Sequence, residues 1–330
     1  MDIPLPDLDR HLVAQFQETT RSARRVIVGT HLNPDGDALG SALAVSHYLD
    51  ALEVENEVVV HNGPPYNLKF LPGSDRIRHQ SQWDDHDLAI VLDLDSLDRL
   101  GKVRETFESV PRMILIDHHI PHHEPGDLRI VDPTSPATAL LLAELFLAFE
   151  HPISPAMATC LLTGIVTDTG SFRFRNTTPD SLAIAATLLK LGGDISLVSE
   201  EVYQKRPLAA TRLMGFALEN LQLSPDGRVC WSVLRLEDFD RLGASEEHTE
   251  GIVSELMAID TVQIAALIRE PKQDRVRASL RSRAGIDVAS AAREFGGGGH
   301  KNAAGCTFMD ESIDQVEQKL VQRLRQCLES

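Results

Sequence analysis

Short aliphatic runs in the first half of the chain constrain its fold more than any other feature. Four such runs, rich in β-branched residues, cover residues 25–30, 57–60, 88–92 and 112–116. Continuous apolar runs of this length are typical of parallel strands that are buried on both faces. Helical stretches, such as residues 38–52, separate some of them. The alternation predicts an α/β domain with a parallel sheet.

The second half predicts a mostly helical segment over residues 136–221, followed by a smaller domain. The turn sequence SPDG at 224–227 precedes expected strands at 229–236, 262–269 and 275–283. A helix near 288–295, a glycine loop and a terminal helix complete this α/β domain. We expect a catalytic domain over 1–193, a helical linker over 194–223 and the smaller domain over 224–330.

Acids and histidines follow the predicted strands. They come after the first, third and fourth runs, and one more acid ends an apolar helical segment. These residues are His31, Asp35 and Asp37, then Asp93, then Asp117, His118 and His119, and finally Asp168. In open parallel sheets, ligands bind outside the carboxyl ends of the strands. We therefore expect these side chains at one edge of the sheet.

So many carboxylates and imidazoles at one edge would repel one another without a cation. Oxygen and imidazole ligands suit Mn²⁺, Mg²⁺, Fe²⁺ or Zn²⁺. No cysteine lies nearby, so a structural cysteine-rich zinc site is not expected. The ligands outnumber what one ion needs. Two ions about 4 Å apart would account for them and would suit hydrolysis of a phosphate ester.

Each residue also has an ordinary structural interpretation. Asp37 could cap a helix after the turn at 33–36, and Asp93 or its neighbour Asp95 could cap the next helix. Asp168 could belong to a helix end, and residues 117–119 to a solvated loop. These interpretations would all have to hold together at independent strands, which favours the metal site.

Several segments resemble the motifs of the DHH phosphoesterase superfamily. They are HLNPDGD at 31–37, the strand end at Asp93, DHH at 117–119 and GIVTDTG at 164–170. GGGGHKNAAG at 296–305 resembles the hallmark of the DHH-associated second domain. The resemblance covers nearly the whole chain and implies an active site in a cleft between the two domains. The layout is most similar to members that act on very short RNA and on 3′-phosphoadenosine 5′-phosphate (pAp).

By position, the resemblance implies six ligands for two divalent ions, expected to be Mn²⁺. They are His31, Asp35, Asp37, Asp93, His118 and Asp168. His119 would face the hydroxide nucleophile or the scissile phosphate, and Asp117 would orient the cluster. His122 and His123 lie beyond the motif. Relatives often have asparagine near position 122, so the sequence departs there. We interpret both histidines as surface residues, and a role for His122 at the edge of the substrate is the alternative.

The second domain is expected to hold phosphate. Arginines at 275, 277, 281 and 283 alternate along a predicted strand and would share one face. Consecutive glycine N–H groups can cradle an anion. The resemblance implies that Arg281, Gly298, Gly299 and His300 bind the substrate. For the other arginines a solvated sheet face is the alternative.

The net charge of −17 argues against binding of long nucleic acid. The four cysteines are far apart and none forms a CxxC pair, which predicts reduced thiols in a cytoplasmic protein. The acidic N-terminus lacks the order of a signal peptide, and Glu144 interrupts the longest apolar run, so no membrane is expected. Expected partners are short RNA, pAp and linear dinucleotides; a homodimer stays open.

Rival functions share parts of this pattern. The nearest is a phosphodiesterase for linear or cyclic dinucleotides, which would use the same site. A RecJ-like single-strand exonuclease would carry further nucleic-acid-binding domains, and a manganese pyrophosphatase would lack the GGGGH sequence. A non-catalytic nucleotide or metal sensor is expected to lack a ligand, and none of the matched ligands is missing.

Overall fold

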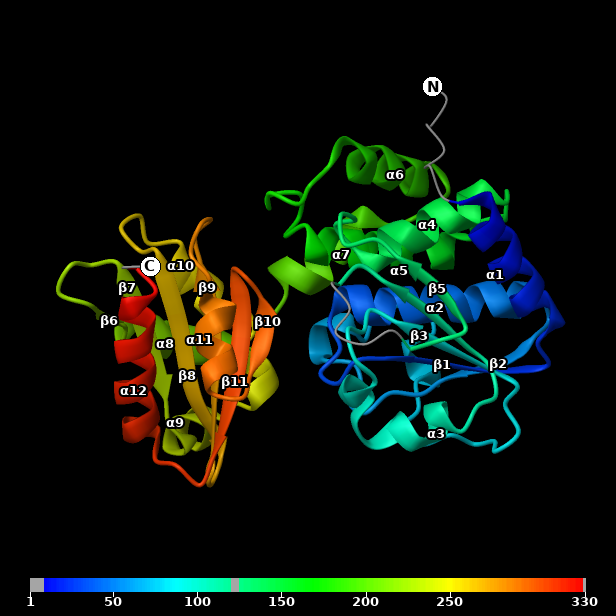
Figure 1. Cartoon of the computed structure of the whole chain (residues 1–330). Coiled ribbons are helices and arrows are strands. Elements are labelled where there is room, and N and C mark those ends of the chain that lie inside the picture. The colour runs from blue at the N-terminus through cyan, green and yellow to red at the C-terminus, as the bar shows by residue number, and fades with distance from the viewer. Residues whose placement is uncertain (1–8, 120–124, 329–330) are drawn as a thin grey trace. The chain divides into compact units, whose positions relative to one another are not determined.

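The computed structural model describes residues 9–119 and 125–328, apart from the side chain of His300. The chain divides into two compact units, Met1–Lys205 and Arg206–Ser330, and each contains one sheet (Figure 1). Residues of the predicted linker form α7 (Ile195–Ser199), the π-turn at Glu200–Gln204, and α8 (Leu208–Glu219). The domain limits at 193 and 224 stay a prediction.

The first unit is built on a five-stranded sheet in the order β2-β1-β3-β4-β5, and every neighbouring pair is parallel. This confirms the predicted parallel sheet. The strands are β1 (Arg25–Thr30), β2 (Glu55–Val58), β3 (Leu88–Leu92), β4 (Met113–Asp117) and β5 (Leu128–Val131). β1 and β3 have the predicted bounds, and β2 begins two residues earlier. The sequence did not predict β5, because Arg129 is exposed on this edge strand and interrupts its apolar run.

Residues of the strands alternate between two apolar layers. Val28 and Ile90 belong to the layer that includes the long helices, whereas Ile27 and Val91 pack with Phe107 of α3 on the other face. Figure 1 shows α3 and the long helices on opposite sides of the sheet. The helices are α1 (Arg10–Ser22), α2 (Gly36–Ala51), α3 (Arg104–Glu108), α4 (Thr138–Ala148), α5 (Pro155–Asp168) and α6 (Pro179–Lys190). Both faces of the sheet are covered, which explains why its strands are continuously apolar.

The second unit has a six-stranded sheet in the order β10-β11-β9-β8-β7-β6, antiparallel except for β7 and β8. Its strands are β6 (Gln222–Leu223), β7 (Val229–Leu234), β8 (Ile264–Lys272), β9 (Arg275–Ser282), β10 (Gly298–His300) and β11 (Ala303–Met309). Its helices after α8 are α9 (Leu236–Leu242), α10 (Ile252–Met257), α11 (Val288–Glu294) and α12 (Ile313–Gln326). The predicted second α/β unit is confirmed.

The glycine run was expected to be a loop, and part of it is strand β10 instead. Gly299 has φ +131°, and a Cβ there would lie 2.5 Å from the carbonyl oxygen of Ala303 on the neighbouring strand. A Cβ at Gly297 would lie 2.1 Å from the carbonyl oxygen of Gly305. Glycine is required because these backbones approach closely, a use that composition alone does not reveal.

Within the described residues, no single helix is long and apolar enough to cross a bilayer. α6 and the segment Ile195–Gln204 meet that criterion only when taken together, across a bend of 119°.

Candidate metal centre

The carboxylate of Asp93 lies at the centre of a buried cluster of histidines and aspartates. Its Oδ2 is 3.3 Å from Nε2 of His31, and its Oδ1 is 3.4 Å from Nε2 of His118. Nε2 of His118 is also 3.2 Å from Oδ2 of Asp168 and 3.9 Å from Oδ2 of Asp37. The two oxygens of one carboxylate therefore face two different histidines.

Three parallel strands and two helices position this cluster. His31 follows β1, Asp93 follows β3 and His118 follows β4, so parallel pairing places them at the same edge of the sheet. Asp168 is the last residue of α5, and Asp37 lies in the first turn of α2. Residues that are far apart in the sequence thus meet in a small volume, which their nitrogen and oxygen atoms line.

The backbone at Asp93 is strained. Asp93 has φ +55°, in the left-handed region that few non-glycine residues adopt, although aspartate adopts it more readily than most. Such conformations cost about 1–3 kcal/mol and persist where the surroundings fix them. Here the Asp93 N–H donates to the carbonyl of Ile116, and the hydroxyl of Thr138 donates to Oδ1 of Asp93 at 3.1 Å. This backbone conformation directs the carboxylate at the strand end toward the two histidines.

Asp37 is held by the start of α4. The backbone N–H groups of Thr138 and Ala139 donate to its two oxygens at 2.7 and 2.8 Å. Helix α5 packs closely against Asp37 at Gly164, where a Cβ would lie 2.6 Å from Oδ1 of Asp37. The sequence interpretation missed Thr138 as a positioning residue; its place directly before an apolar helix was the only indication available.

Both histidines that face Asp93 have a fixed ring orientation. Nδ1 of His31 lies 2.9 Å from the carbonyl oxygen of Leu32, and Nδ1 of His118 lies 3.1 Å from that of Ser135. A carbonyl only accepts, so Nδ1 carries the proton in each ring and Nε2 is directed at the carboxylates. Metal-ligating histidines commonly have this arrangement, in which the second nitrogen donates to a carbonyl.

Burial and charge oppose each other in this cluster. Burial and the negative charge of Asp93 raise the pKa of Asp37 to about 7, and burial together with Asp37 raises the pKa of Asp168 well above its usual range. Burial works against protonation of His118, but Asp93, Asp37 and Asp168 outweigh it and raise its pKa to about 11. Without a cation the carboxylates must therefore share protons, and a divalent cation would replace those protons.

His119 is oriented by the carboxylate that precedes it. The Nδ1–H of His119 donates to Oδ1 of Asp117 at 2.8 Å, and its backbone N–H donates to the same oxygen at 3.1 Å. Burial lowers the pKa of His119, but Asp117 and Asp93 raise it by more, so the net shift is upward. Oδ2 of Asp117 is buried and has no hydrogen-bond partner within the described residues. Asp117 thus fixes the ring of His119 beside the cluster.

The donor set fits divalent metal ions. Ligand atoms lie within 4.8 Å of one another in three groups: His31 with Asp35 and Asp93; Asp37 with His118 and Asp168; and Asp93 with His118 and His119. The structure thus brings together all six residues predicted as ligands, whose role as ligands stays a prediction. His122 and His123 lie outside the described residues, so their predicted surface position stays a prediction too.

In the second unit, the arginines of β9 and Arg283, which directly follows it, differ in their partners. Arg277 forms an ion pair with Glu246 at 2.5 Å, and the Arg283 guanidinium donates to the backbone carbonyl of Val262 at 3.0 Å. Arg281 donates to the carbonyl of Leu280, and no carboxylate lies within ion-pair distance of it among the described residues. Burial lowers the pKa of Arg281, and the charge of Glu250 offsets this only in part.

Strand register places Arg281 beside the glycine strand. Arg281 pairs with Ala303 of β11, which in turn pairs with residue 300 of β10, so the three positions form one row across the sheet. The side chain of His300 itself is outside the described structure. The next row contains Gly299, and the row after it contains Gly298, where a Cβ would meet nothing within 4 Å. The four residues predicted to bind substrate therefore have backbone positions on three successive rows of the sheet.

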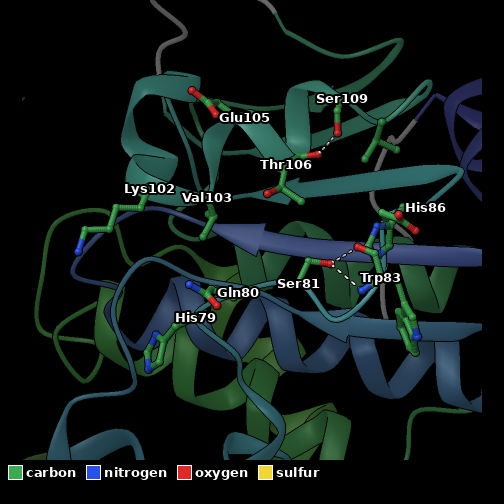
Figure 2. Close-up of a pocket in the computed structure, with 12 residues that line it drawn as sticks. His79, Gln80, Ser81, Trp83, His86, Lys102, Val103, Glu105, Thr106 and Ser109 are labelled. Carbon is green, nitrogen blue, oxygen red and sulfur yellow. Dashed lines mark hydrogen bonds between the residues drawn. The ribbon is translucent and has the colours of Figure 1, made fainter.

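A second hollow lies elsewhere in the first unit, with a volume of about 560 Å³ (Figure 2). Its lining includes His79, Trp83, Lys102 and Thr106. At its side, the buried carboxylate of Glu57 accepts from Ser81 and pairs with His86 at 3.0 Å. None of the six predicted ligands lines this hollow.

Comparison with known proteins agrees with this geometry. A model of the DHH family, N-terminal domain, matches residues 25–165, and a model of the DHHA1 domain matches residues 227–330. The bifunctional oligoribonuclease and PAP phosphatase NrnA of Thermus thermophilus is 33% identical over 92% of this chain and 90% of its own length. The chain belongs to the DHH family of phosphoesterases and is a hydrolase.

Further relatives agree with the family. The protein of the same description from Bacillus subtilis is 28% identical over 92% of this chain and 95% of its own. An exopolyphosphatase-related protein from Bacteroides fragilis has a TM-score of 0.90 at 28% identity, and the match covers 98% of both chains. RecJ from Thermus thermophilus in complex with Mn²⁺ has a TM-score of 0.56 at 17% identity, covering 100% of this chain and 56% of RecJ. The last likeness shows the fold alone.

Proposed function

We propose that the enzyme hydrolyses very short oligoribonucleotides to mononucleotides and removes the 3′-phosphate of pAp. The observation that carries this proposal is the position of Asp93, whose two oxygens face His31 and His118 and suit a carboxylate shared between two cations. Its relatives from Thermus thermophilus and Bacillus subtilis are described as oligoribonucleases and PAP phosphatases. These support the choice of substrate.

Six residues would hold two divalent ions, which we expect to be Mn²⁺: His31, Asp35, Asp37, Asp93, His118 and Asp168. When bound, such ions lower the pKa of water and polarise phosphoryl oxygens. His119, oriented by Asp117, would donate from Nε2 to an oxygen of the scissile phosphate. Thr138 and the first turn of α4 would keep Asp37 and Asp93 in place.

The second unit would hold a phosphate away from the reacting one. No carboxylate lies within ion-pair distance of the half-buried Arg281 among the described residues, and removing a cation from water without a close anion is costly. A phosphate on Arg281, Gly298, Gly299 and His300 would relieve that cost. We propose that the scissile ester lies over the metals of the first domain, and that the second domain holds this phosphate.

Substrate length is limited by charge. Each phosphate that a protein contacts adds affinity and salt dependence. The chain carries a net charge of −17, so further nucleotides would extend along a surface that repels them. We propose that long nucleic acid and membranes are not partners, and that the enzyme is cytoplasmic; its four cysteines are buried free thiols, as a reducing compartment favours.

A graded substrate panel tests the proposal. We expect kcat/KM on 5′-labelled RNA to be highest for roughly two to four nucleotides and to fall for longer strands, with a shallow salt dependence. Release of inorganic phosphate from pAp should accompany it. Rising kcat/KM out to about twenty nucleotides with a steep salt slope would instead indicate a RecJ-like exonuclease. Preference for linear or cyclic dinucleotides over pAp would favour the dinucleotide phosphodiesterase, the main alternative.

A further inference from the structure

The loop that follows Asp168 is basic and aromatic, although the chain as a whole is acidic. Residues 169–178 read TGSFRFRNTT, with two arginines, two phenylalanines and no carboxylate, in a chain of net charge −17. Phe174 is 57% exposed and is flanked by Arg173 and Arg175, which are also exposed. The neighbouring Phe172, in contrast, packs against the apolar core of the first unit. One ring anchors the loop and the other is presented to solvent.

The loop is held rigidly in a strained conformation. Gly170, Ser171 and Phe172 have φ of +56°, +61° and +62°, and a left-handed conformation is rare for a residue as bulky as phenylalanine. The backbone N–H groups of Arg173 and Phe174 both donate to the carbonyl of Thr169 at 3.0 Å. Strain of this kind persists where surrounding contacts fix it, and it clusters at ligand-binding sites.

Two contacts hold the loop close to Asp168 at the end of α5. The side-chain amide of Asn176 donates to the backbone carbonyl of Asp168 at 3.0 Å. The tip of the Phe174 ring lies over Gly170, where a Cβ would be 2.4 Å from Cζ, so the ring rests on a residue two positions after Asp168. Two residues span at most about 7 Å of extended chain, so the ring lies near the candidate metal ligand.

We propose that Phe174 stacks on a nucleobase of the substrate next to the scissile phosphate, while Arg175 faces its phosphates. This inference rests on the proposed function. Bases stack on aromatic side chains without regard to sequence, and arginines beside them attract the backbone. The ring therefore makes the enzyme select nucleotides over other phosphate esters, and it does so in the first unit, separately from the phosphate-binding residues of the second.

The test compares a 5′-phosphorylated diadenylate with two versions in which one nucleotide or the other lacks its base. Phe174→Ala should lower kcat/KM on the intact diadenylate about tenfold. On one of the abasic versions, the wild-type enzyme and Phe174→Ala should differ less than twofold. Phe174→Tyr should retain wild-type values, since it keeps the ring. Leu182→Ala, which shortens a 50% exposed side chain on α6, is the matched control and should leave kcat/KM unchanged on all three substrates.

Metal content of Phe174→Ala should equal that of wild type, which shows that the centre beside the loop is intact. Equal loss on the intact and on both abasic substrates would overturn the stacking role, as would wild-type activity of Phe174→Ala on all of them. Failure of the wild-type enzyme to cleave any of the three would overturn the proposed function, and the inference with it.

Discussion

The edge of the first sheet and the arginine-bearing face of β9 are both charged, yet their electrostatic problems are opposite. At the first, burial and mutual repulsion raise the pKa values of Asp37 and Asp168, so the carboxylates lack a cation. At the second, burial lowers the pKa of Arg281 more than the charge of Glu250 raises it, and no carboxylate lies within ion-pair distance of the guanidinium among the described residues. A divalent cation would balance the carboxylates of the first region, and a phosphate would balance the arginine of the second.

The local structure differs in the same way. The first region is a set of strand ends and helix ends, where each side chain comes from a different element and has fixed partners, such as Thr138 for Asp93. The second is one strand face beside a glycine strand, where close backbone approach decides which residues fit. Binding of metal therefore depends on the precise placement of each ligand, and binding of phosphate depends on open space beside the glycine strand.

The largest effect is expected for Asp93→Asn. Asparagine tolerates the left-handed backbone at this position but removes the charge that faces both histidines. Loss of metal assistance worth several kcal/mol should lower kcat/KM by at least about 10²-fold. Metal analysis of the purified variant should show reduced content. Asp98→Asn, at an exposed carboxylate on the same connection, is the control and should retain both metal and activity.

A smaller effect is expected for Arg281→Ala. Removing a charge-assisted hydrogen bond to phosphate should raise KM about tenfold or more, with metal content near that of wild type. Arg275→Ala, on the same face at the other end of β9, should change KM little. Steady-state kinetics on pAp and diribonucleotides measures both. Loss of metal from folded Arg281→Ala would contradict the assignment of metal binding to the first region and phosphate binding to the second.

Removing metal should affect the first region alone. A ligand present at 100 times its Kd stabilises the folded state by about 2.7 kcal/mol. Hydrogen exchange of the whole protein, with and without Mn²⁺, should therefore show slower exchange around the ends of β1, β3 and β4 when metal is present. Amides of β8 and β9 should exchange at unchanged rates. Equal protection in both sheets would contradict this assignment.

The smallest effect concerns an acid away from the centre. Burial, then Asp180 and Asp132, raises the pKa of Glu144 on α4 from 4.5 to about 7. Because the folded-state pKa is raised, the protonated side chain favours folding below about pH 4.5, and this stability is lost as the pH rises through 7. Glu144→Gln should therefore raise the free energy of unfolding by about 1 kcal/mol at pH 8, after allowance for partial exposure.

At pH 4 the same Glu144→Gln substitution should be close to neutral. Denaturant unfolding at the two pH values measures the difference. The effect should be the same with and without Mn²⁺, because these acids are not part of the ligand groups. A metal-dependent effect would show that acidity alone, and not the arrangement around Asp93, attracts the cation.

Much of the first unit could be predicted from the sequence, because its strands are buried on both faces and read as continuous apolar runs. β5 could not, since Arg129 breaks the run on an edge strand. The position of the strand-end acids at one edge could also be predicted, because parallel strands end on the same side of a sheet. The support from Thr138 depends on how α4 packs, and the glycine strand β10 depends on contacts with β11; neither is encoded locally.

We expect the buried edge of the first sheet to hold two divalent cations that share Asp93. Anomalous diffraction from crystals grown with Mn²⁺, recorded on both sides of the manganese absorption edge, tests this expectation directly. Two peaks should appear about 4 Å apart, one beside His31 and one beside His118, with the carboxylate of Asp93 between them. A single peak away from Asp93, or none at this edge in crystals of active enzyme, would contradict it.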